Sequence, residues 1–548
     1  MVVRKQYCPQ FQYRFSGWNC WRDPSHGVWK CPMLAWTHER VGVPMAVAAT
    51  TVVTKAQGHS GTSIIVPLAL AQFICSFAAT NMNVAISSIA ADLSTTVLGV
   101  QTAITLFTLV MAALMIPGSK LTDIWGRKFC LVLGLGIYGA GALLAATAPR
   151  LGLLIFGYSA LEGIGSALLI PPVYILTTVL FTNLATRAKN FGIISAAGGI
   201  GAAAGPLIGG LITSAISWRA AFLLQVLVVA YIIYLSLRLD DPGIEGERPK
   251  FDLGGAAISA VGLVILVIGI LLSRSYGWVQ SRADFTIFGT TLIHQGGISP
   301  VWIFIIIGAL FLAWFFAHIR SYAKAGKEPL LSPTLFQNKV SNAGLVTQLV
   351  QWLTIQGSFF VTSVYLQTIR GYNAIATGLI LTPATAGILL SSLAAGRFAR
   401  RRPQAQLVRW GFLLTMAGMA LLLLLVRVTS GVWTFIPGLF IAGAGIGIML
   451  TSSVNIVQSS FAEKEQGEIS GLSRSVSNLG SSLGTALAGS VLASSLVVGN
   501  KHFALALVVI LAADILGLLA AFRIPLKFAP GPPGTEMPVE SGRAHAAA

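Results

Sequence analysis

The stretch "GSKLTDIWGRK", Gly118–Lys128, places four charged side chains between two long apolar segments. "TAITLFTLVMAALMI" precedes it and "FCLVLGLGIYGAGALLAATA" follows it. A charged cluster between two runs of this length is typical of a short loop that joins two membrane spans.

The composition of the whole chain extends this interpretation. Of its 548 residues, 55% are hydrophobic and 10% are charged, and the mean hydropathy is +0.78. A soluble domain carries about 25% charged residues. Apolar runs long enough to cross a bilayer recur along the chain. The sequence therefore predicts an all-α polytopic membrane protein.

Fourteen spans are expected, and the two ends of the chain are expected to lie outside the bilayer. Residues 1–62 are rich in Trp, Cys and His and predict a disordered cytoplasmic extension; an initiation site placed too early is the alternative, with Met45 as the later start. Residues 528–548 predict a disordered tail. The expected spans are 64–89, 98–118, 129–148, 152–180, 191–215, 219–238, 253–273, 300–319, 343–366, 375–396, 406–426, 432–456, 468–496 and 503–524.

The basic residues predict the orientation of the chain. Twenty Lys and Arg residues fall in the loops after even-numbered spans and in the C-terminal flank, and seven fall in the loops after odd-numbered spans. The positive-inside rule then places both termini in the cytoplasm. The net charge of +18 accordingly indicates contact with anionic lipid in the bilayer and no partnership with nucleic acid.

Each polar or small residue of the 118–128 segment has an expected role. Gly118 allows the end of its span to approach a neighbour closely, and Gly126 relieves the turn. Asp123 is expected to accept hydrogen bonds from helix N-terminal amides and to pair with Arg127. Arg127 and Lys128 anchor the next span. An ordinary basic turn that merely obeys the positive-inside rule is the alternative.

A second motif, "GGIGAAAGPLIGG", covers Gly198–Gly210 in the fifth span. Gly201, Gly205 and Gly209 recur every four residues and predict a small-residue stripe on one helix face. Pro206 removes a backbone hydrogen bond and is expected to kink the helix. Gly210 closes the motif, and "WRAAF" follows soon after.

The two motifs resemble those of the major facilitator superfamily, and the number of spans is similar to that of its fourteen-helix drug–proton antiporter branch. The resemblance implies two six-helix bundles at 63–240 and 331–527, joined by two extra helices at 241–330. It also implies that the 118–128 segment forms a charge relay at a cytoplasmic gate. "GRFARRRPQ", which begins at Gly396, is a degenerate counterpart in the second half.

The resemblance further implies a function. The expected protein is a monomeric secondary active transporter of the plasma membrane. It would export small amphipathic compounds by alternating access coupled to protons. No cofactor and no metal site is expected.

Two departures from the family pattern bear on the coupling ion. Ala78 in "FAATNMNVA" occupies the place of an Asp in the first span, although Asn83 matches the pattern. In the fourth span Ser159 replaces an Arg and Glu162 replaces a Gln. A transporter of a specific solute without proton coupling is therefore the alternative.

Only two carboxylates are expected near the middle of spans, Glu162 and Asp514. A charge at the bilayer centre costs about 2.5–3.5 kcal/mol on insertion scales, so such residues are functional candidates by default. The resemblance places Glu162 beside a central cavity, where it would bind a proton or a cationic substrate, and it makes the span of Asp514 peripheral. A neutral side chain in a helix interface is the alternative for both.

Polar residues of the second half are weaker candidates. Gln351 and Tyr365 belong to an unusually polar ninth span, and interhelical hydrogen bonding is the alternative role. Arg474 lies near the cytoplasmic end of its span, where snorkelling accounts for it, and pairing with another span is the alternative.

A different class of protein, such as a membrane enzyme or a non-transporting sensor, has little support. The expected spans show no cluster of His, Asp or Cys at membrane depth and no nucleotide-binding loop of the Walker type.

Overall fold

The structure is a computed structural model that divides into two compact units, Met1–Gly58 and His59–Ala548. It describes residues 21–22, 29–30, 61–181, 184–239, 250–287, 290–399, 401–427, 429–461, 465–493 and 500–526. In the first unit β1 (Trp21–Arg22) pairs antiparallel with β2 (Trp29–Lys30). The rest of the predicted N-terminal extension and the predicted C-terminal tail lie outside the described residues.

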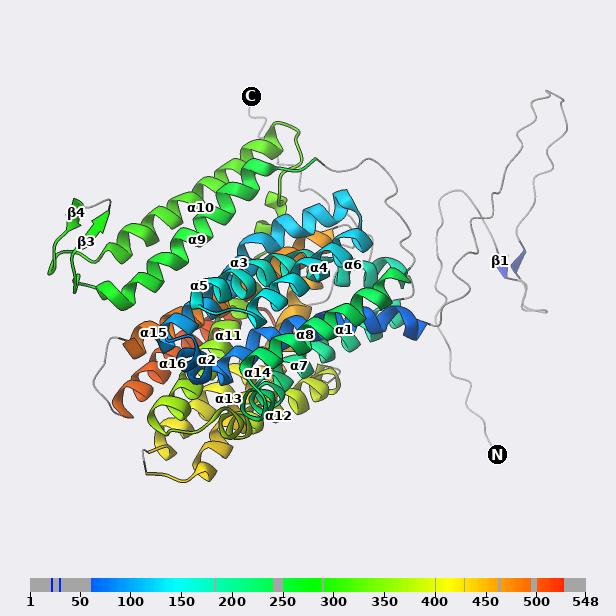
Figure 1. Ribbon diagram of the computed structural model, residues 1–548. Helices are drawn as coiled ribbons and strands as arrows, with labels where there is room; N and C mark the ends of the chain where they lie inside the picture. The colour runs from blue at the N-terminus through cyan, green and yellow to red at the C-terminus, as the bar shows by residue number, and fades with distance from the viewer. Residues whose placement is uncertain are drawn as a thin grey trace, which may run out of the picture. The chain divides into compact units, whose positions relative to one another are not determined.

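The second unit is built from long helices (Figure 1). Their bounds are α1 Gly61–Asn81, α3 Val97–Trp125, α4 Arg127–Ala146, α5 Leu151–Leu154 continuing into α6 Gly163–Leu180, α7 Leu184–Ala215, α8 Trp218–Leu237, α9 Leu253–Tyr276, α10 Pro300–Lys324, α11 Lys339–Val364, α12 Ala374–Ala399, α13 Gln404–Leu425, α14 Phe435–Gln458, α15 Gln466–Ala493 and α16 Asn500–Phe522.

Short elements connect or interrupt the long helices. Two π-helical segments continue them: η2 joins α5 to α6, and η4 extends α11. The bounds of the short elements are η1 Met82–Val84, α2 Ile86–Asp92, η2 Ile155–Glu162, β3 Phe285–Ile287, β4 Thr290–Ile293, η3 Pro333–Gln337, η4 Tyr365–Ile369 and η5 Val432–Thr434.

Twelve helices in the described residues are long and apolar enough to cross a membrane. The two other long helices, α11 and α15, fall outside that group because their sequences are more polar, and they bring the number of long helices to the fourteen that the sequence predicts. Side chains such as Gln348 and Ser473 are buried where these two helices pack together, so this polarity does not face lipid. The prediction of an all-α membrane fold is confirmed.

The sequence mispredicts several boundaries. The first span ends at Asn81, eight residues before the predicted end, and η1 and α2 follow it. The second span continues to Trp125, so most of the predicted charged loop is helical. Helix α3 ends where Gly126 adopts φ +103°, a conformation that favours glycine. The antiparallel β3–β4 hairpin between α9 and α10 was not predicted.

Side-chain caps explain where several helices begin. Thr96, Ser217 and Asp252 accept hydrogen bonds from backbone amides in the first turns of α3, α8 and α9. Asn338 accepts two such bonds at the start of α11. These residues satisfy amides that would otherwise lack partners at a helix N-terminus.

The helices form two halves with the same packing pattern. In the first half α1 packs on α7, α3 and α4 pack on α6, and α4 packs on α8. In the second half the corresponding pairs are α11 on α15, α12 and α13 on α14, and α13 on α16. The halves meet along two seams, one between α3 and α15 and one between α7 and α12.

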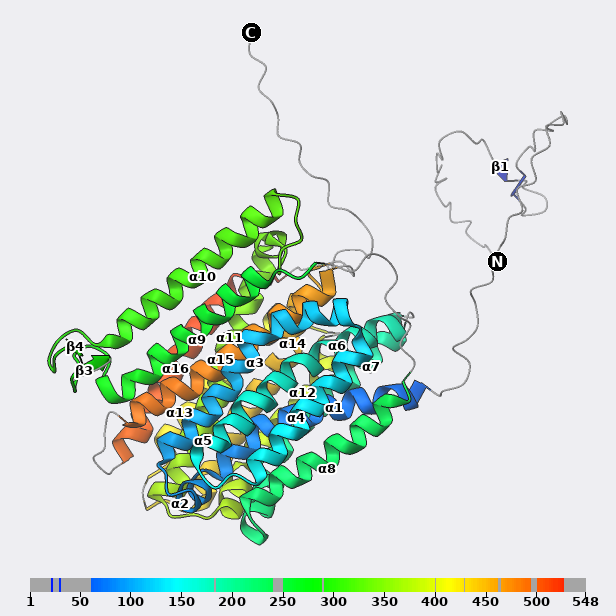
Figure 2. The ribbon, with the colours of Figure 1, turned by 45° about the horizontal axis from the view of Figure 1, so that its top comes forward.

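Helices α9 and α10 cover one of these seams. They lie side by side on one flank of the bundle with the β3–β4 hairpin at their end, as both views show (Figure 1, Figure 2). Helix α9 packs against both α3 and α15, and α10 packs on the outer side of α9. The pair of extra helices therefore contacts both halves through α9.

Candidate functional site

The segment from Gly118 to Lys128 lies where the first half meets the second. A Cβ at Gly118 would overlap the backbone carbonyl of Ala167, so α3 and α6 approach closely here. Ser119 Oγ donates a hydrogen bond to Gly467 O in α15 at 3.2 Å. The end of the bundle that contains this contact is called the gate end below.

Asp123 is directed at the second half. Its carboxylate lies against the first turn of α15, with Oδ2 4.0 Å from the position of a Cβ on Gly467. A small cavity lies between the two halves at this point. Its lining comprises Ile116, Ser119, Lys120, Asp123, Leu330, Leu331 and Glu468. A carboxylate near a helix N-terminus interacts favourably with the helix dipole.

Two of the three basic residues of the segment, Arg127 and Lys128, behave differently. The expected ion pair between Asp123 and Arg127 is not formed, because Asp123 faces α15, and Arg127 Nε has no hydrogen-bond partner among the described residues. Lys128 Nζ donates to Leu237 O at 2.8 Å and to Leu239 O at 2.7 Å. This ammonium group thereby satisfies carbonyls at the end of α8, as a cation at a helix C-terminus does.

The glycine stripe of α7 packs against α1. A Cβ at Gly201, Gly205 or Gly209 would overlap atoms of Phe73, Thr80 or Asn81, respectively. Thr80 Oγ1 donates to Ala202 O at 3.1 Å, which joins the two helices directly.

The end of the same motif faces α12. A Cβ at Gly210 would lie 2.6 Å from Ala374 O, and a Cβ at Gly378 would overlap the carbonyl of Pro206. The motif therefore allows close approach both within the first half and across the α7–α12 seam.

Glu162 is fully buried in η2, inside the first half. Its polar neighbours Tyr138, Tyr158 and Cys75 all belong to that half. Tyr138 Oη donates to Gln225 at 2.5 Å, and neither carboxylate oxygen of Glu162 has a hydrogen-bond partner of good geometry among the described residues. The structure therefore places Glu162 away from the seams between the halves, whereas the resemblance implied a central position.

The residues that replace the family's expected charges are packing residues. Ala78 is buried, and its carbonyl accepts a hydrogen bond from Tyr158 Oη at 3.2 Å. Ser159 Oγ donates to Ala103 O at 2.7 Å.

Three further candidates lie inside the second half. Asp514 of α16 is buried and accepts a hydrogen bond from Thr354 Oγ1 of α11 at 2.5 Å. Gln351 accepts one from Ser453 Oγ of α14 at 2.9 Å. Tyr365 stacks on Phe503 with the ring centroids 4.3 Å apart.

Asn83 lies at the end of the bundle opposite the gate end, called the far end below. Its carbonyl accepts a hydrogen bond from Gln367 Nε2 of the second half at 3.0 Å, while its own side-chain amide has no partner among the described residues. The five candidates from the sequence thus lie in separate places and do not form one cluster.

Of the two roles expected for Arg474, the structure shows the pairing with another span. This residue lies eight positions after the start of α15, which is about two helical turns, and its side chain is only partly exposed. The guanidinium donates to Tyr174 Oη of α6 in the first half and lies 4.8 Å from the centre of that ring. Arg474 therefore pairs with another helix and does not snorkel to the surface.

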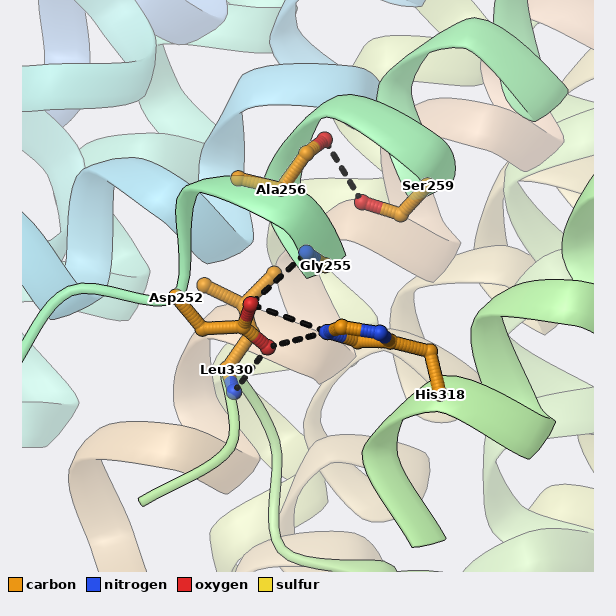
Figure 3. A network of polar contacts seen from close by, with 6 residues as sticks. All are labelled: Asp252, Gly255, Ala256, Ser259, His318 and Leu330. Carbon is orange, nitrogen blue, oxygen red and sulfur yellow. Dashed lines mark hydrogen bonds and ion pairs between the residues drawn. The ribbon is translucent and has the colours of Figure 1, made fainter. Parts of the chain in front are cut away.

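A network of polar contacts that the sequence did not reveal joins the start of α9 to α10 and to the loop after α10 (Figure 3). The buried carboxylate of Asp252 lies 3.0 Å from His318 Nε2 of α10 and accepts hydrogen bonds from the amides of Gly255 at 2.8 Å and Leu330 at 3.3 Å. The N-cap position of Asp252 was a usable sequence signal, but its contacts with α10 and the following loop were not.

Two repeated helix bundles that meet along two seams, with polar contacts between them at both ends, define a membrane transporter of two halves. The family model described as Major Facilitator Superfamily matches residues 68–291 and 255–485. The chain belongs to this superfamily.

Several characterised or named proteins are similar to this chain. It is 28% identical to the probable actinorhodin transporter of Streptomyces coelicolor over 75% of this chain and 69% of that protein. It is 30% identical to the puromycin resistance protein pur8 of Streptomyces alboniger over 78% and 81%, respectively. It is 24% identical to the multidrug resistance protein Stp of Mycobacterium tuberculosis over 75% and 72%.

A solved structure supports the fold. The nucleoside transporter NupG has a TM-score of 0.56 to this chain at 12% identity, over 84% of this chain and 99% of NupG. At this identity the likeness concerns the fold alone.

Proposed function

We propose that this protein is a secondary active transporter that exports small amphipathic compounds across the plasma membrane by alternating access coupled to protons. The observation that supports it most directly is the meeting of two similarly packed halves along the α3–α15 and α7–α12 seams. Opening such seams alternately at the two ends exposes a site between the halves to one side of the membrane at a time.

The printed names of the relatives support the direction and the class of substrate. Two of them are named for resistance to puromycin or to multiple drugs, and a third is named as a transporter of actinorhodin. Export of small organic molecules accounts for both kinds of name.

Glu162 is the proposed coupling residue. Its carboxyl group is fully buried beside Tyr138, Tyr158 and Cys75, and neither oxygen has a hydrogen-bond partner among the described residues, which leaves both oxygens available to a proton. Uptake and release of this proton as η2 changes its surroundings would link the pH gradient to the change between conformations.

A second candidate function, transport of a specific solute without proton coupling, is favoured by Ala78 and Ser159. Both occupy places where the family carries charge, and both are buried packing residues here.

One experiment separates the two functions. Purified protein in proteoliposomes is given radiolabelled puromycin, and uptake is measured with an imposed pH difference and, separately, by exchange without one. Proton coupling predicts that wild type concentrates the label only with the pH difference, and that Glu162→Gln abolishes this while exchange continues.

Asp514→Asn is the matched control for this substitution, because it also neutralises a buried carboxylate. It should preserve both activities. Accumulation by the Glu162→Gln variant would exclude Glu162 as the coupling site, and pH-independent transport by wild type would favour the second function.

A further inference from the structure

Arg474 brings a full positive charge to the contact between the two halves. Its guanidinium extends from α15 to Tyr174 of α6. Other side chains make hydrogen bonds between the halves in the described part of the chain, and all of them are uncharged. They are Ser87, Gln101, Ser119, Ser214, Gln356, Gln367, Ser475 and Ser482.

This charge has no acidic partner in the part of the chain that the structure describes. Within the described residues, no carboxylate forms an ion pair with Arg474. The two carboxylates expected at membrane depth lie elsewhere, since Glu162 is beside Tyr138 and Asp514 accepts a hydrogen bond from Thr354. An unpaired charge inside a membrane protein is costly, and its presence points to function.

The group has unused capacity to bind an anion. A guanidinium has five N–H donors in a planar fork that matches the oxygens of a carboxylate, sulfonate or phosphate. Among the described residues its one hydrogen bond is the bond to Tyr174, and its side chain is partly exposed.

Neutral polar groups adjoin this position on the first half. Tyr174 Oη donates to Gln72 Oε1 at 3.2 Å, and Gln72 Nε2 donates to Ser76 Oγ at 3.2 Å. Gly198 of α7 lies over this pair, with its Cβ position 3.2 Å from Gln72. The surroundings of Arg474 thus supply hydrogen-bonding groups and no negative charge.

We propose that Arg474, assisted by Tyr174, binds the anionic group of the transported compound, so that the preferred substrates are amphipathic organic anions. This inference rests on the proposed export function for the step of transport, but the binding site itself is defined by the residues above. An anion that engages the free edge of the guanidinium competes with Tyr174 and loosens a contact between α15 and α6.

Two fluorescent probes that share one ring system test the proposal. 8-Anilinonaphthalene-1-sulfonate is an amphipathic anion, and N-phenyl-1-naphthylamine is its uncharged counterpart. Their affinities for the purified full-length protein are measured by equilibrium dialysis in a neutral detergent, with protein-free micelles as the background. We expect the sulfonate to bind at least about tenfold more tightly than the amine, because only the sulfonate forms hydrogen bonds to the charged guanidinium.

The variants separate binding from a structural role. Arg474→Gln should weaken sulfonate binding at least about tenfold and leave amine binding within about twofold. Arg474→Lys should restore part of the affinity, and Tyr174→Phe should weaken it less than Arg474→Gln does. Arg523→Gln, which removes an exposed basic residue, should change neither affinity.

Three results would overturn the proposal. These are equal affinity of wild type for the two probes, an equal loss for both probes in Arg474→Gln, and displacement of the sulfonate by dispersed phosphatidylglycerol but not by excess naphthalene-1-sulfonate. The last result would assign the site to a lipid headgroup. Because this assay measures binding, it gives a result even where puromycin transport fails, and the two proposals can fail separately.

Discussion

Gln367 joins the two halves at the far end of the bundle through its contact with Asn83. Its Nε2 donates to Asn83 O at 3.0 Å, while its Oε1 accepts from the amide of Ser87 at 3.0 Å and from Ser87 Oγ at 2.8 Å. At the gate end Ser119 contacts Gly467. The halves therefore touch at both ends, and any opening must break one set of contacts.

Gln367→Ala should favour conformations that are open at the far end, because three hydrogen bonds between the halves are lost. Spin labels at positions 91 and 368, both exposed, would report a longer distance in double electron–electron resonance. Ser358→Ala is the control, since among the described residues Ser358 Oγ bonds only to Ile355 O of its own helix. Unchanged distances in Gln367→Ala would show that this side chain does not hold the far end closed.

Asp123→Asn should reduce transport sharply without loss of protein from the membrane. The amide loses the negative charge that faces the first turn of α15, which weakens the contact at the gate end. Transport per unit of membrane protein is the measurement, and Asp284→Asn at an exposed hairpin position is the control. Full activity of Asp123→Asn would leave the segment with no role beyond an ordinary basic turn.

Replacement by alanine should have different effects on stability at two glycines of α7. A Cβ at Gly205 would overlap Thr80, whereas a Cβ at Gly199 meets nothing within 4 Å. Gly205→Ala should lower the unfolding temperature in detergent, and Gly199→Ala should raise or preserve it, because alanine favours a helix by up to about 1 kcal/mol. Equal behaviour of the two variants would contradict the close packing of α7 on α1.

Asp252→Ala should destabilise the attachment of α9 and α10. It leaves the amides of Gly255 and Leu330 and the ring of His318 without their acceptor, at about 1–3 kcal/mol for each buried unpaired group. Asp252→Asn retains an acceptor oxygen and should lose less stability. Thermal unfolding of the purified protein measures both, and a wild-type profile for the Ala variant would show that the network contributes no stability.

The orientation inferred from the basic residues predicts from which side of the membrane an impermeant reagent reaches each end of the bundle. A single cysteine at Trp125, which is 49% exposed, should react with an impermeant thiol reagent only after cells are opened. A single cysteine at Ala91, at the far end, should react in intact cells. The reverse pattern would place the gate end outside the cell.

The sequence by itself determined the class of fold and the order of the spans along the chain, although not all of their boundaries. Each apolar residue favours membrane insertion wherever its helix finally packs. Composition and the length of the apolar runs therefore suffice to recognise the spans. The spacing of Gly201, Gly205 and Gly209 likewise predicts a smooth helix face, because the helical period depends only on the backbone. The expected glycine turn at Gly126 follows from the same local geometry and is present at φ +103°.

Only the tertiary structure decided which polar groups meet. The partner of Arg474 is 300 positions away at Tyr174, and Asp252 finds His318 on another helix. Glu162 lies inside the first half because η2 turns its side chain toward α4, and α11 and α15 carry polar residues because they are buried in the bundle. Such pairings depend on the rotation of each helix about its own axis and on its neighbours, and the order of residues along one span specifies neither.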